Sequence, residues 1–329
     1  MFYLYVLYTK VMDISVVIPL LNEEESLQEL YNWIAKVMQS NSYDYEVLFI
    51  DDGSTDASWN VIEKLASEHK QVKGIRFQKN YGKSQALDAG FEAANGDVVI
   101  TMDADLQDNP DEIPELFDLI TKENYDLISG WKKKRYDSVI AKNLPSKLFN
   151  AAARKTSGLK LHDFNCGLKA YKNIVIKTVK VSGEMHRYIP VLAKNEGFTK
   201  IGEKVVQHQA RKYGETKFGM NRFVNGFLDL ITISFLSKFG KRPMHFFGLW
   251  GSMVFAVGFL AAAYIGFMKL YKLSTGLKTI LITDNPWLYI SLTAMVIGTQ
   301  LFLAGFIGEL LIKTKGNEKH YTIKETLNT

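Results

Sequence analysis

The sequence predicts an α/β domain with a mostly parallel, Rossmann-like sheet, followed by a C-terminal region of two transmembrane helices. From residue 14 onward, short β-branched runs alternate with segments in which apolar residues recur at helical spacing. Two later stretches, residues 243–268 and 285–308, contain no charged side chain. Each stretch is at least as long as the roughly 20 apolar residues that cross a hydrocarbon core. Buried helices of soluble proteins rarely stay uncharged over such a length, so we interpret both stretches as membrane spans.

Strands and helices alternate regularly in the first half of the chain. The predicted strands cover residues 14–19, 45–50, 72–77, 97–102 and 126–130. The predicted helices cover residues 24–38, 57–69, 83–94 and 113–122. This order implies parallel strands joined by helical crossovers on both faces of the sheet. Neither the glycine-rich dinucleotide fingerprint nor a Walker-type lysine loop occurs, which argues against dehydrogenases and P-loop enzymes.

The chain of 329 residues is long enough for about two domains. We divide it into an N-terminal extension (1–12), an α/β domain (13–219), an amphipathic interface segment (220–242), a membrane region (243–312, with spans at about 245–268 and 287–312) and a basic tail (313–329). The net charge of +5 is modest, and basic residues are enriched beside the apolar spans. This distribution favours lipid headgroups or phosphate ligands over nucleic acid.

An acidic turn follows the predicted strand at residues 97–102. Asp103 and Asp105 would lie at the carboxyl edge of the sheet, where open α/β sheets bind ligands. Two carboxylates on one short turn can converge on a hard divalent cation, and the amide oxygen of Gln107 could add a neutral ligand. The alternative is an acidic loop in which Asp108 or Asp111 caps the next helix, and the turn alone leaves both interpretations open.

Three earlier strands also end in polar motifs. The motifs are Pro19 with Asn22 and Glu23, the run Asp51-Asp52-Gly53-Ser54, and the run Asn80-Tyr81-Gly82-Lys83. Taken singly, residues of this kind are common in plain turns, and the run at residues 51–54 alone would favour that interpretation. In this order, with the Asp103–Gln107 turn and the apolar helices, they resemble glycosyltransferase family 2 in its polyprenyl-phosphate branch, which includes dolichol-phosphate mannose synthases and undecaprenyl-phosphate enzymes.

The resemblance extends from about Met12 to the last apolar helix. It implies the GT-A nucleotide-sugar fold for residues 13–219 and an inverting hexosyltransferase that depends on Mg²⁺ or Mn²⁺. The expected donor is a nucleotide sugar, UDP-hexose, and the expected acceptor is a polyprenyl phosphate, undecaprenyl phosphate. The processive synthases of the family carry a Gln-x-x-Arg-Trp motif, which this sequence lacks, so transfer of a single sugar is favoured.

The resemblance also implies residue roles. The donor would contact Pro19, Asn22, Glu23, Asp51, Asp52, Lys83 and Asp103, with Asp51 or Asp52 accepting the imide hydrogen of uracil. The metal ion would be held by Asp103, Asp105 and Gln107, and the catalytic candidates are Asp105 and Asp163. The lipid phosphate would contact Arg135, Lys147, Arg187, Arg211 and Lys217.

The acceptor residues have a second interpretation. By residue type, the segments around Arg135 and Lys147 favour a solvated basic face, since charge runs usually face water. A lone residue such as Arg187 is more often structural. The loop at residues 211–219 is flanked by glycine and could clasp phosphates, or could be a basic linker toward the membrane.

The run from Asp163 to Lys169 (Asp-Phe-Asn-Cys-Gly-Leu-Lys) resembles a further segment of the family, and a strand here would return beside the active face. A lipid phosphate is largely anionic at neutral pH, because its second pKa is about 6, so a strong general base is not required. We therefore expect Asp163 to orient the acceptor or a basic partner. Cys166 is expected to be a small buried apolar residue.

Lysines flank both spans and also occur between them, so the positive-inside rule barely decides the orientation. Because nucleotide sugars are cytosolic, we place the catalytic domain in the cytosol, at the inner (cytoplasmic) membrane. Gly258, Ala262 and Gly266 form a small-residue stripe that fits either a homo-oligomer or packing of one span on the other.

Three other functions are weighed against this one. A metal-dependent phosphatase would carry its carboxylate pair after the first strand, where this chain has residues 19–23. A non-catalytic membrane scaffold would not need Asp103, Asp105, Arg211 and Lys217 together. The nearest alternative is a family 2 transferase that uses another lipid or a polysaccharide as its acceptor. The motifs do not identify the hexose, and they do not distinguish a UDP donor from a GDP donor.

Overall fold

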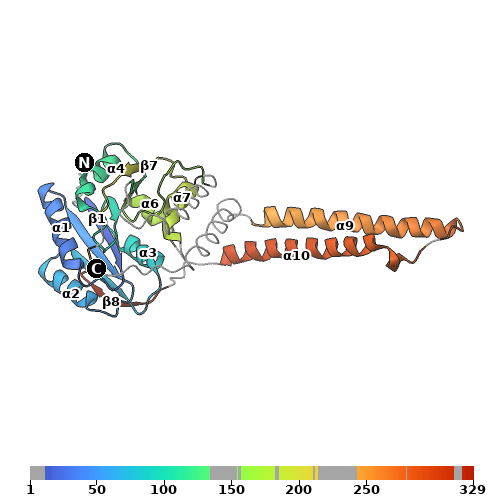
Figure 1. The fold of residues 1–329 in the computed structure, drawn as a ribbon, viewed down its shortest axis with the longest axis horizontal. Coiled ribbons are helices and arrows are strands. Elements are labelled where there is room, and N and C mark those ends of the chain that lie inside the picture. The colour runs from blue at the N-terminus through green and yellow to red at the C-terminus, as the bar shows by residue number, and fades with distance from the viewer. Residues whose placement is uncertain are drawn as a thin grey trace, which may run out of the picture. The chain divides into compact units, whose positions relative to one another are not determined.

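The computed structural model describes residues 12–133, 154, 157–181, 185–209, 212–213, 243–278, 280–314 and 321–329. The chain divides into two units (Figure 1). The first unit comprises Met1–Ser234 together with Lys319–Thr329, and the second comprises Phe235–Glu318.

The first unit is built on an eight-stranded sheet with the strand order β7-β5-β6-β4-β1-β2-β3-β8. The strands are β1 (Ile14–Leu20), β2 (Tyr45–Asp51), β3 (Val72–Phe77), β4 (Val98–Thr101), β5 (Leu127–Trp131), β6 (Lys169–Lys172), β7 (Ile201–Val205) and β8 (Ile323–Leu327). The pairs β1–β2, β1–β4, β2–β3 and β5–β7 are parallel, whereas β3–β8, β4–β6 and β5–β6 are antiparallel. The prediction of an α/β domain with a mostly parallel sheet is therefore confirmed.

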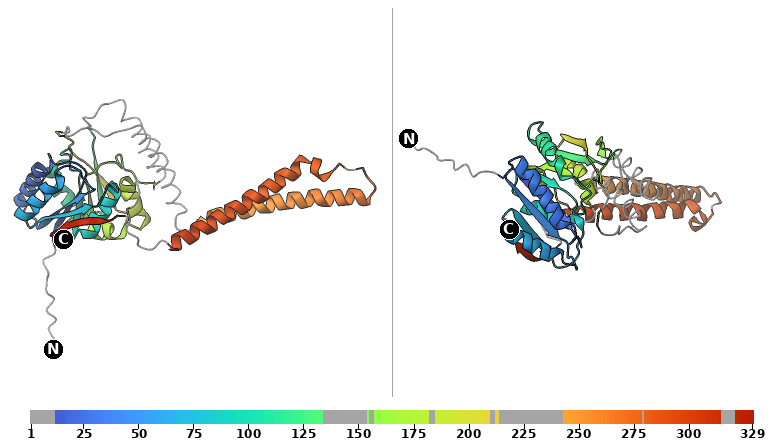
Figure 2. Two further views of the ribbon diagram at one scale, coloured as in Figure 1. Left: turned by 90° about the horizontal axis from the view of Figure 1, so that it is seen from below. Right: turned by 60° about the vertical axis from the view of Figure 1, so that its left-hand side comes forward.

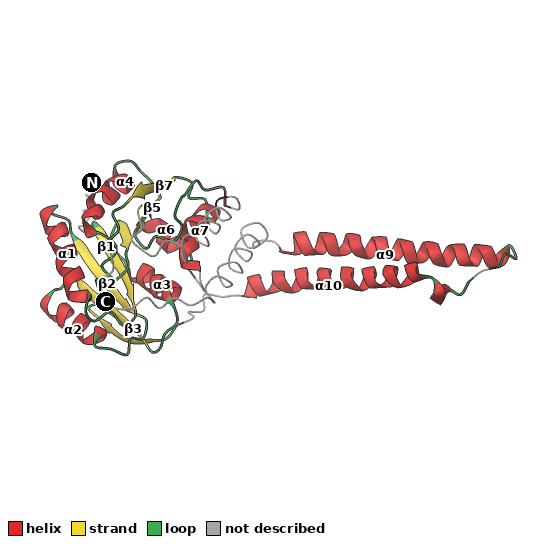
Figure 3. Cartoon of the chain, in the orientation of Figure 1, coloured by secondary structure: helices red, strands yellow, loops and turns green. Residues whose placement is uncertain are grey.

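Helices cover both faces of this sheet (Figure 3). They are α1 (Leu27–Ser40), α2 (Ser58–Glu68), α3 (Lys83–Ala93), η1 (Pro110–Glu112), α4 (Ile113–Thr121), α6 (Asn173–Thr178), η2 (Met185–Tyr188) and α7 (Ile189–Asn195). Alternate residues of a strand point to opposite faces, and β1 shows the result. Val16 and Ile18 pack with α1, α2 and α4, whereas Val17 packs with α3, α6 and α7. All seven residues of β1 are buried, as expected for a central parallel strand.

The end of the chain adds a strand that the sequence analysis did not assign. β8 pairs antiparallel with β3, with Leu327 opposite Gly74 and Glu325 opposite Arg76. Its side chains are largely exposed, so the run Ile-Lys-Glu-Thr-Leu has no buried apolar pattern that would identify a strand. The pairing covers the edge of β3, which would otherwise expose unpaired backbone groups.

The second unit contains α9 (Pro243–Ser274), η3 (Ile282–Asp284) and α10 (Pro286–Thr314). The two long helices run side by side (Figure 2). By length and composition, Pro243–Ser274 and Pro286–Leu310 are candidate membrane spans. Large apolar side chains along them are exposed, among them Leu260 and Trp287, which argues against the alternative of buried core helices.

Glycines allow α9 and α10 to approach closely. A Cβ atom on Gly298 would lie 2.5 Å from the backbone nitrogen of Phe255, and one on Gly258 would lie 2.6 Å from the carbonyl oxygen of Ser291. Nothing lies within 4 Å of a Cβ atom on Gly266. Of the two glycines in the predicted stripe, Gly258 packs on α10 and Gly266 does not. Self-association through this stripe stays a prediction.

A Gly298→Val substitution is expected to destabilise the helix pair by about 1–3 kcal/mol, because the added side chain forces the helices apart. Thermal unfolding of the detergent-solubilised chain, followed by tryptophan fluorescence, would measure the effect. Gly266→Val is the matched control, since it makes the same helix-interior change in open space. Equal melting temperatures for the two variants would contradict this packing.

Candidate functional site

Three adjacent strands deliver the predicted donor residues to one edge of the sheet. β4, β1 and β2 are neighbours and run parallel, so their carboxyl ends lie together. Pro19 is opposite Ile50 in the register of β1 and β2, and Leu20 is opposite Asp51. The turns that carry Asn22, Asp52 and Asp103 follow directly.

The loops after β1 and β2 are tied to each other by hydrogen bonds. Asn22 adopts a φ of 56°, and its side-chain oxygen accepts a hydrogen bond from the backbone nitrogen of Thr55 at 2.8 Å. The backbone nitrogen of Asn22 donates to the Ser54 hydroxyl at 2.9 Å. The backbone nitrogen of Glu23 donates to the Ser58 hydroxyl at 2.9 Å. Asn22 and Glu23 therefore hold the shape of this edge, whatever they contact in a donor.

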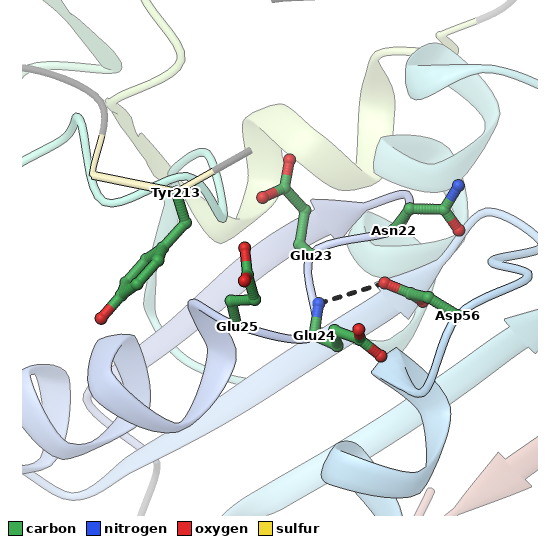
Figure 4. A pocket seen from close by; sticks show the side chains of 6 residues that line it. All are labelled: Asn22, Glu23, Glu24, Glu25, Asp56 and Tyr213. Atoms are coloured by element: carbon green, nitrogen blue, oxygen red, sulfur yellow. Dashed lines mark hydrogen bonds between the residues drawn. The ribbon is translucent and has the colours of Figure 1, made fainter. Parts of the chain in front are cut away.

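A small acidic cavity of about 150 Å³ lies beside these loops (Figure 4). Its lining consists of Asn22, Glu23, Glu24, Glu25, Asp56 and Tyr213. The backbone nitrogen of Glu24 donates to Asp56 at 3.2 Å across it. Four of the six lining side chains are carboxylates, so their charges disfavour a phosphate group that carries no cation.

The two aspartates after β2 are buried and bonded to protein groups. Asp51 accepts a hydrogen bond from the Ser54 nitrogen at 2.8 Å, and its other oxygen lies 3.4 Å from Nε of Arg76. Asp52 accepts bonds from the backbone nitrogens of Tyr81 at 2.7 Å and Gly82 at 2.9 Å. Burial raises the pKa of Asp52, although these two N–H groups oppose the shift. Asp52 thus fixes the loop that leads into α3.

Gly53 makes the close contact between these loops feasible. Its φ of +78° favours glycine, and a Cβ atom there would lie 2.5 Å from the carbonyl carbon of Lys79. Only a residue without a side chain allows the segment after β2 to touch the segment after β3 at this point.

Lys83, the first residue of α3, forms an ion pair with Asp103. Burial by itself would raise the pKa of Asp103, but Lys83, Lys132 and Lys169 together hold that pKa below its ordinary value. The carboxylate of Asp103 is therefore kept ionised at the edge of the sheet.

The turn that carries Asp103 and Asp105 is held by its own side chains. Asp105 is 8% exposed and accepts a hydrogen bond from the Gln107 nitrogen at 3.2 Å, around Leu106 at φ 60°. Asp108 accepts a bond from the Asp103 nitrogen at 3.1 Å. The cap of η1 is Asn109, whose side chain accepts from the Asp111 nitrogen, so neither Asp108 nor Asp111 plays the capping role considered from the sequence.

Two residues that the sequence analysis did not select support this turn. The Nζ atom of Lys132 lies 2.8 Å from Oδ1 of Asp108, and the lysine side chain is only 10% exposed. Burial lowers the pKa of Lys132, but the charge of Asp108 outweighs this effect and raises the pKa overall. His208 is nearly buried and forms a β-bridge with Asp108. Lys132 is the first residue of a run of four basic residues. The only sequence signal that could have separated it from the other three is its position directly after a strand.

The segment from Asp163 to Lys169 packs against Asp103. A Cβ atom on Gly167 would lie 2.6 Å from Oδ2 of Asp103, and the Thr101 hydroxyl donates to the Gly167 carbonyl at 2.8 Å. The expected strand begins only at Lys169, as β6, and it returns antiparallel beside β4; residues 163–168 precede it without forming a strand. Asp163 is 2% exposed and accepts a bond from the Asn165 nitrogen at 3.0 Å.

Cys166 is buried, as expected, and burial raises the pKa of its thiol to about 12. A thiol of this kind is not a nucleophile at neutral pH. The segment therefore shapes the site instead of supplying a reactive sulfur.

The acceptor residues are only partly within the described chain. Arg187 lies in η2, where the neighbouring His186 lies 3.1 Å from the hydroxyl of Ser84, the second residue of α3. The segment with Arg187 is thus adjacent to Lys83. The predictions for Arg135, Lys147, Arg211, Lys217 and the interface segment 220–242 fall outside the described residues.

Comparison with known proteins identifies the family. The model of Glycosyl transferase family 2 matches residues 15–180. A dodecaprenyl-phosphate galacturonate synthase from Rhizobium johnstonii is 34% identical over 305 residues, which cover 92% of this chain and 88% of the relative. An undecaprenyl-phosphate 4-deoxy-4-formamido-L-arabinose transferase from Shewanella sediminis is 34% identical over 91% of this chain and 86% of the relative.

The fold has counterparts among solved structures. Glucosyl-3-phosphoglycerate synthase from Mycobacterium tuberculosis, in complex with uridine diphosphate, matches with a TM-score of 0.53 and 22% identity. The match covers 69% of this chain and 80% of the solved chain, and at this identity it bears on the fold alone. Motif order, sheet topology and the matches along the sequence agree, and the chain belongs to glycosyl transferase family 2.

Proposed function

We propose that this protein transfers one sugar from a nucleotide sugar, a UDP-hexose, to a polyprenyl phosphate, undecaprenyl phosphate, at the cytosolic face of the inner membrane. The observation that carries the proposal is the pairing of Lys83 with Asp103 on a chain that also has two helices of membrane-spanning length. A soluble acceptor would not require such helices. Both relatives described above are named for sugar transfer to a polyprenyl phosphate.

The side chains at this edge fit a hard divalent cation. Asp103, Asp105 and Gln107 offer two carboxylates and an amide oxygen, which are the donors that Mg²⁺ and Mn²⁺ prefer. Gly167 packs directly against the Asp103 carboxylate, so that any side chain at position 167 would displace the Asp103 oxygens. Among the residues that the structure describes, no group of three or more His, Cys, Asp or Glu forms a metal cluster, so this mixed set is the proposed ligand set. Bound there, the cation supplies Lewis-acid stabilisation of the departing diphosphate.

The residues of the chain position both substrates. Lys83 contributes a positive charge beside the diphosphate, and Asp51 or Asp52 can use remaining lone pairs to accept the uracil imide hydrogen. An oxygen of the lipid phosphate attacks the anomeric carbon from the face opposite the diphosphate. The bond from carbon to the diphosphate oxygen breaks, and its electron pair leaves with the nucleoside diphosphate. The sugar anomer is inverted.

The acceptor phosphate would be received by basic side chains. Arg187 is the described member of this group, and its helix lies beside the start of α3. Arg135, Lys147, Arg211 and Lys217 complete the proposed set. Each can form charge-assisted hydrogen bonds to phosphate oxygens.

An Asp163→Asn variant is expected to retain turnover within about fivefold of the wild type, because the phosphate nucleophile is already an anion. The asparagine oxygen can keep the bond from the Asn165 nitrogen, so the local turn is preserved. Initial rates at saturating donor and acceptor would measure the effect. A loss of a hundredfold or more would contradict this mechanism, in which turnover does not depend on the charge of Asp163.

The proposal is tested with the purified full-length chain, undecaprenyl phosphate and either Mg²⁺ or Mn²⁺. Radiolabelled UDP-glucose, UDP-galacturonic acid and GDP-mannose are supplied separately, and label that enters the organic phase is counted. One donor is expected to give a lipid-linked monosaccharide. Label in a polymer, or no transfer from any nucleotide sugar, would overturn the proposal.

A further inference from the structure

Tyr321, in the C-terminal tail, is anchored in the core of the first unit. It is 8% exposed, and its ring stacks on Phe77 with centroids 4.8 Å apart and an interplanar angle of 21°. Its hydroxyl donates a hydrogen bond to Glu92 of α3 at 3.2 Å. Tyr321 is therefore held from both β3 and α3.

Phe77 links this tyrosine to the loop that follows β3. It is the last residue of β3, and Tyr81 meets its ring edge-on, with centroids 5.8 Å apart and an angle of 89°. The backbone nitrogen of Gln78 donates to the carbonyl of Thr322 at 3.0 Å. The tail thus supports the loop through both a ring and the main chain.

That loop carries the groups that organise the donor side of the site. The nitrogens of Tyr81 and Gly82 donate to Asp52, and the next residue is Lys83, which pairs with Asp103. The positions of Asp52 and Lys83 therefore depend on a loop that packs, through Phe77, on Tyr321.

We infer that Tyr321 is a positioning residue for the nucleotide part of the donor site, acting through Phe77 and residues 78–83. The inference rests on the proposed function, which assigns the nucleotide to this edge. Stacked and edge-on aromatic pairs stabilise their arrangement beyond the area that they bury. Without the Tyr321 ring, the loop gains conformational freedom that nucleotide binding must then remove, so affinity falls. Tyr321 comes after α10 in the sequence, so the segment that supports the donor loop follows the two membrane helices along the chain.

Nucleotide affinity provides the first test. The purified full-length chain is titrated calorimetrically with UDP and, separately, with GDP in the presence of Mg²⁺. Tyr321→Ala is expected to weaken binding of whichever nucleotide the wild type binds by about three- to tenfold. Tyr321→Phe keeps the ring and is expected to stay within about twofold of the wild type. Thr322→Ala changes an exposed neighbour while keeping its carbonyl, and serves as the matched control.

Amide hydrogen exchange provides a test that needs no nucleotide. Tyr321→Ala and Tyr321→Leu are both expected to speed exchange at Tyr81 and Gly82 while β1 and β4 keep their protection. Tyr321→Phe is expected to restore slow exchange. Unchanged exchange at these two amides, or uniformly faster exchange across the sheet in both variants, would overturn the positioning role.

The two proposals fail in different ways. If the wild type binds one nucleotide and Tyr321→Ala binds it equally well, the positioning role is wrong and the proposed function stands. If the wild type binds neither UDP nor GDP, the proposed function is wrong, and hydrogen exchange alone decides whether Tyr321 supports the loop.

Discussion

The Asp105→Asn variant is expected to lose sugar transfer by roughly a thousandfold while remaining folded and membrane-bound. Asparagine has nearly the same shape and can still accept the bond from the Gln107 nitrogen, so the turn is preserved. What it removes is the negative charge of a side chain that is only 8% exposed at the carboxyl edge of the sheet. The measurement is the rate at which labelled sugar enters the organic phase, alongside the membrane fraction of the protein.

Asp111→Asn is the matched control for this variant. Asp111 lies in the same segment, in η1, and its exposed side chain accepts a bond from the indole nitrogen of Trp33 at 3.0 Å, which asparagine can also accept. Its transfer rate is expected to stay within about twofold of the wild type, as for an exposed site away from the chemistry. Full activity in Asp105→Asn would contradict the proposed role of this carboxylate.

Lys83→Met is expected to lower kcat/KM for the nucleotide sugar by roughly a hundredfold. Methionine keeps most of the aliphatic length but leaves Asp103 without its ion-pair partner and the diphosphate without a nearby ammonium group. Initial rates over a range of donor concentrations would separate a loss of binding from a loss of turnover. The variant is also expected to melt at a lower temperature, because the pair is partly buried.

Lys122→Met makes the same chemical change at an exposed position. Lys122 pairs with Asp118 four residues earlier on the surface of α4, where such pairs contribute little. Its kcat/KM is expected to equal that of the wild type. If Lys83→Met were as active as this control, the ion pair with Asp103 would be structural only.

Much of the site could be predicted because its residues follow strands. Pro19, Asp51 and Asp103 each lie within or directly after a predicted parallel strand, and parallel strands end at a common edge. The sequence positions of these residues therefore imply their spatial neighbourhood. The order of the motifs also pointed to the family that the comparisons establish.

Other parts of the site depend on contacts between segments far apart in the chain. Lys132 is buried against Asp108, although a basic run is ordinarily solvated. The expected strand starts only at Lys169, and residues 163–168 form a loop before it that brings Gly167 against Asp103. No local pattern encodes these contacts, because they arise from the way β6 inserts between β4 and β5.

The sequence by itself determined the α/β class, the carboxylates at the strand ends and the two helices of membrane-spanning length, because each depends on local periodicity or composition. The tertiary structure alone decided that Lys83 pairs with Asp103, that Tyr321 stacks on Phe77 and that β8 pairs with β3. These contacts join segments that are distant in sequence. They form only when packing of the sheet and its helices brings those segments together, which a local pattern cannot specify.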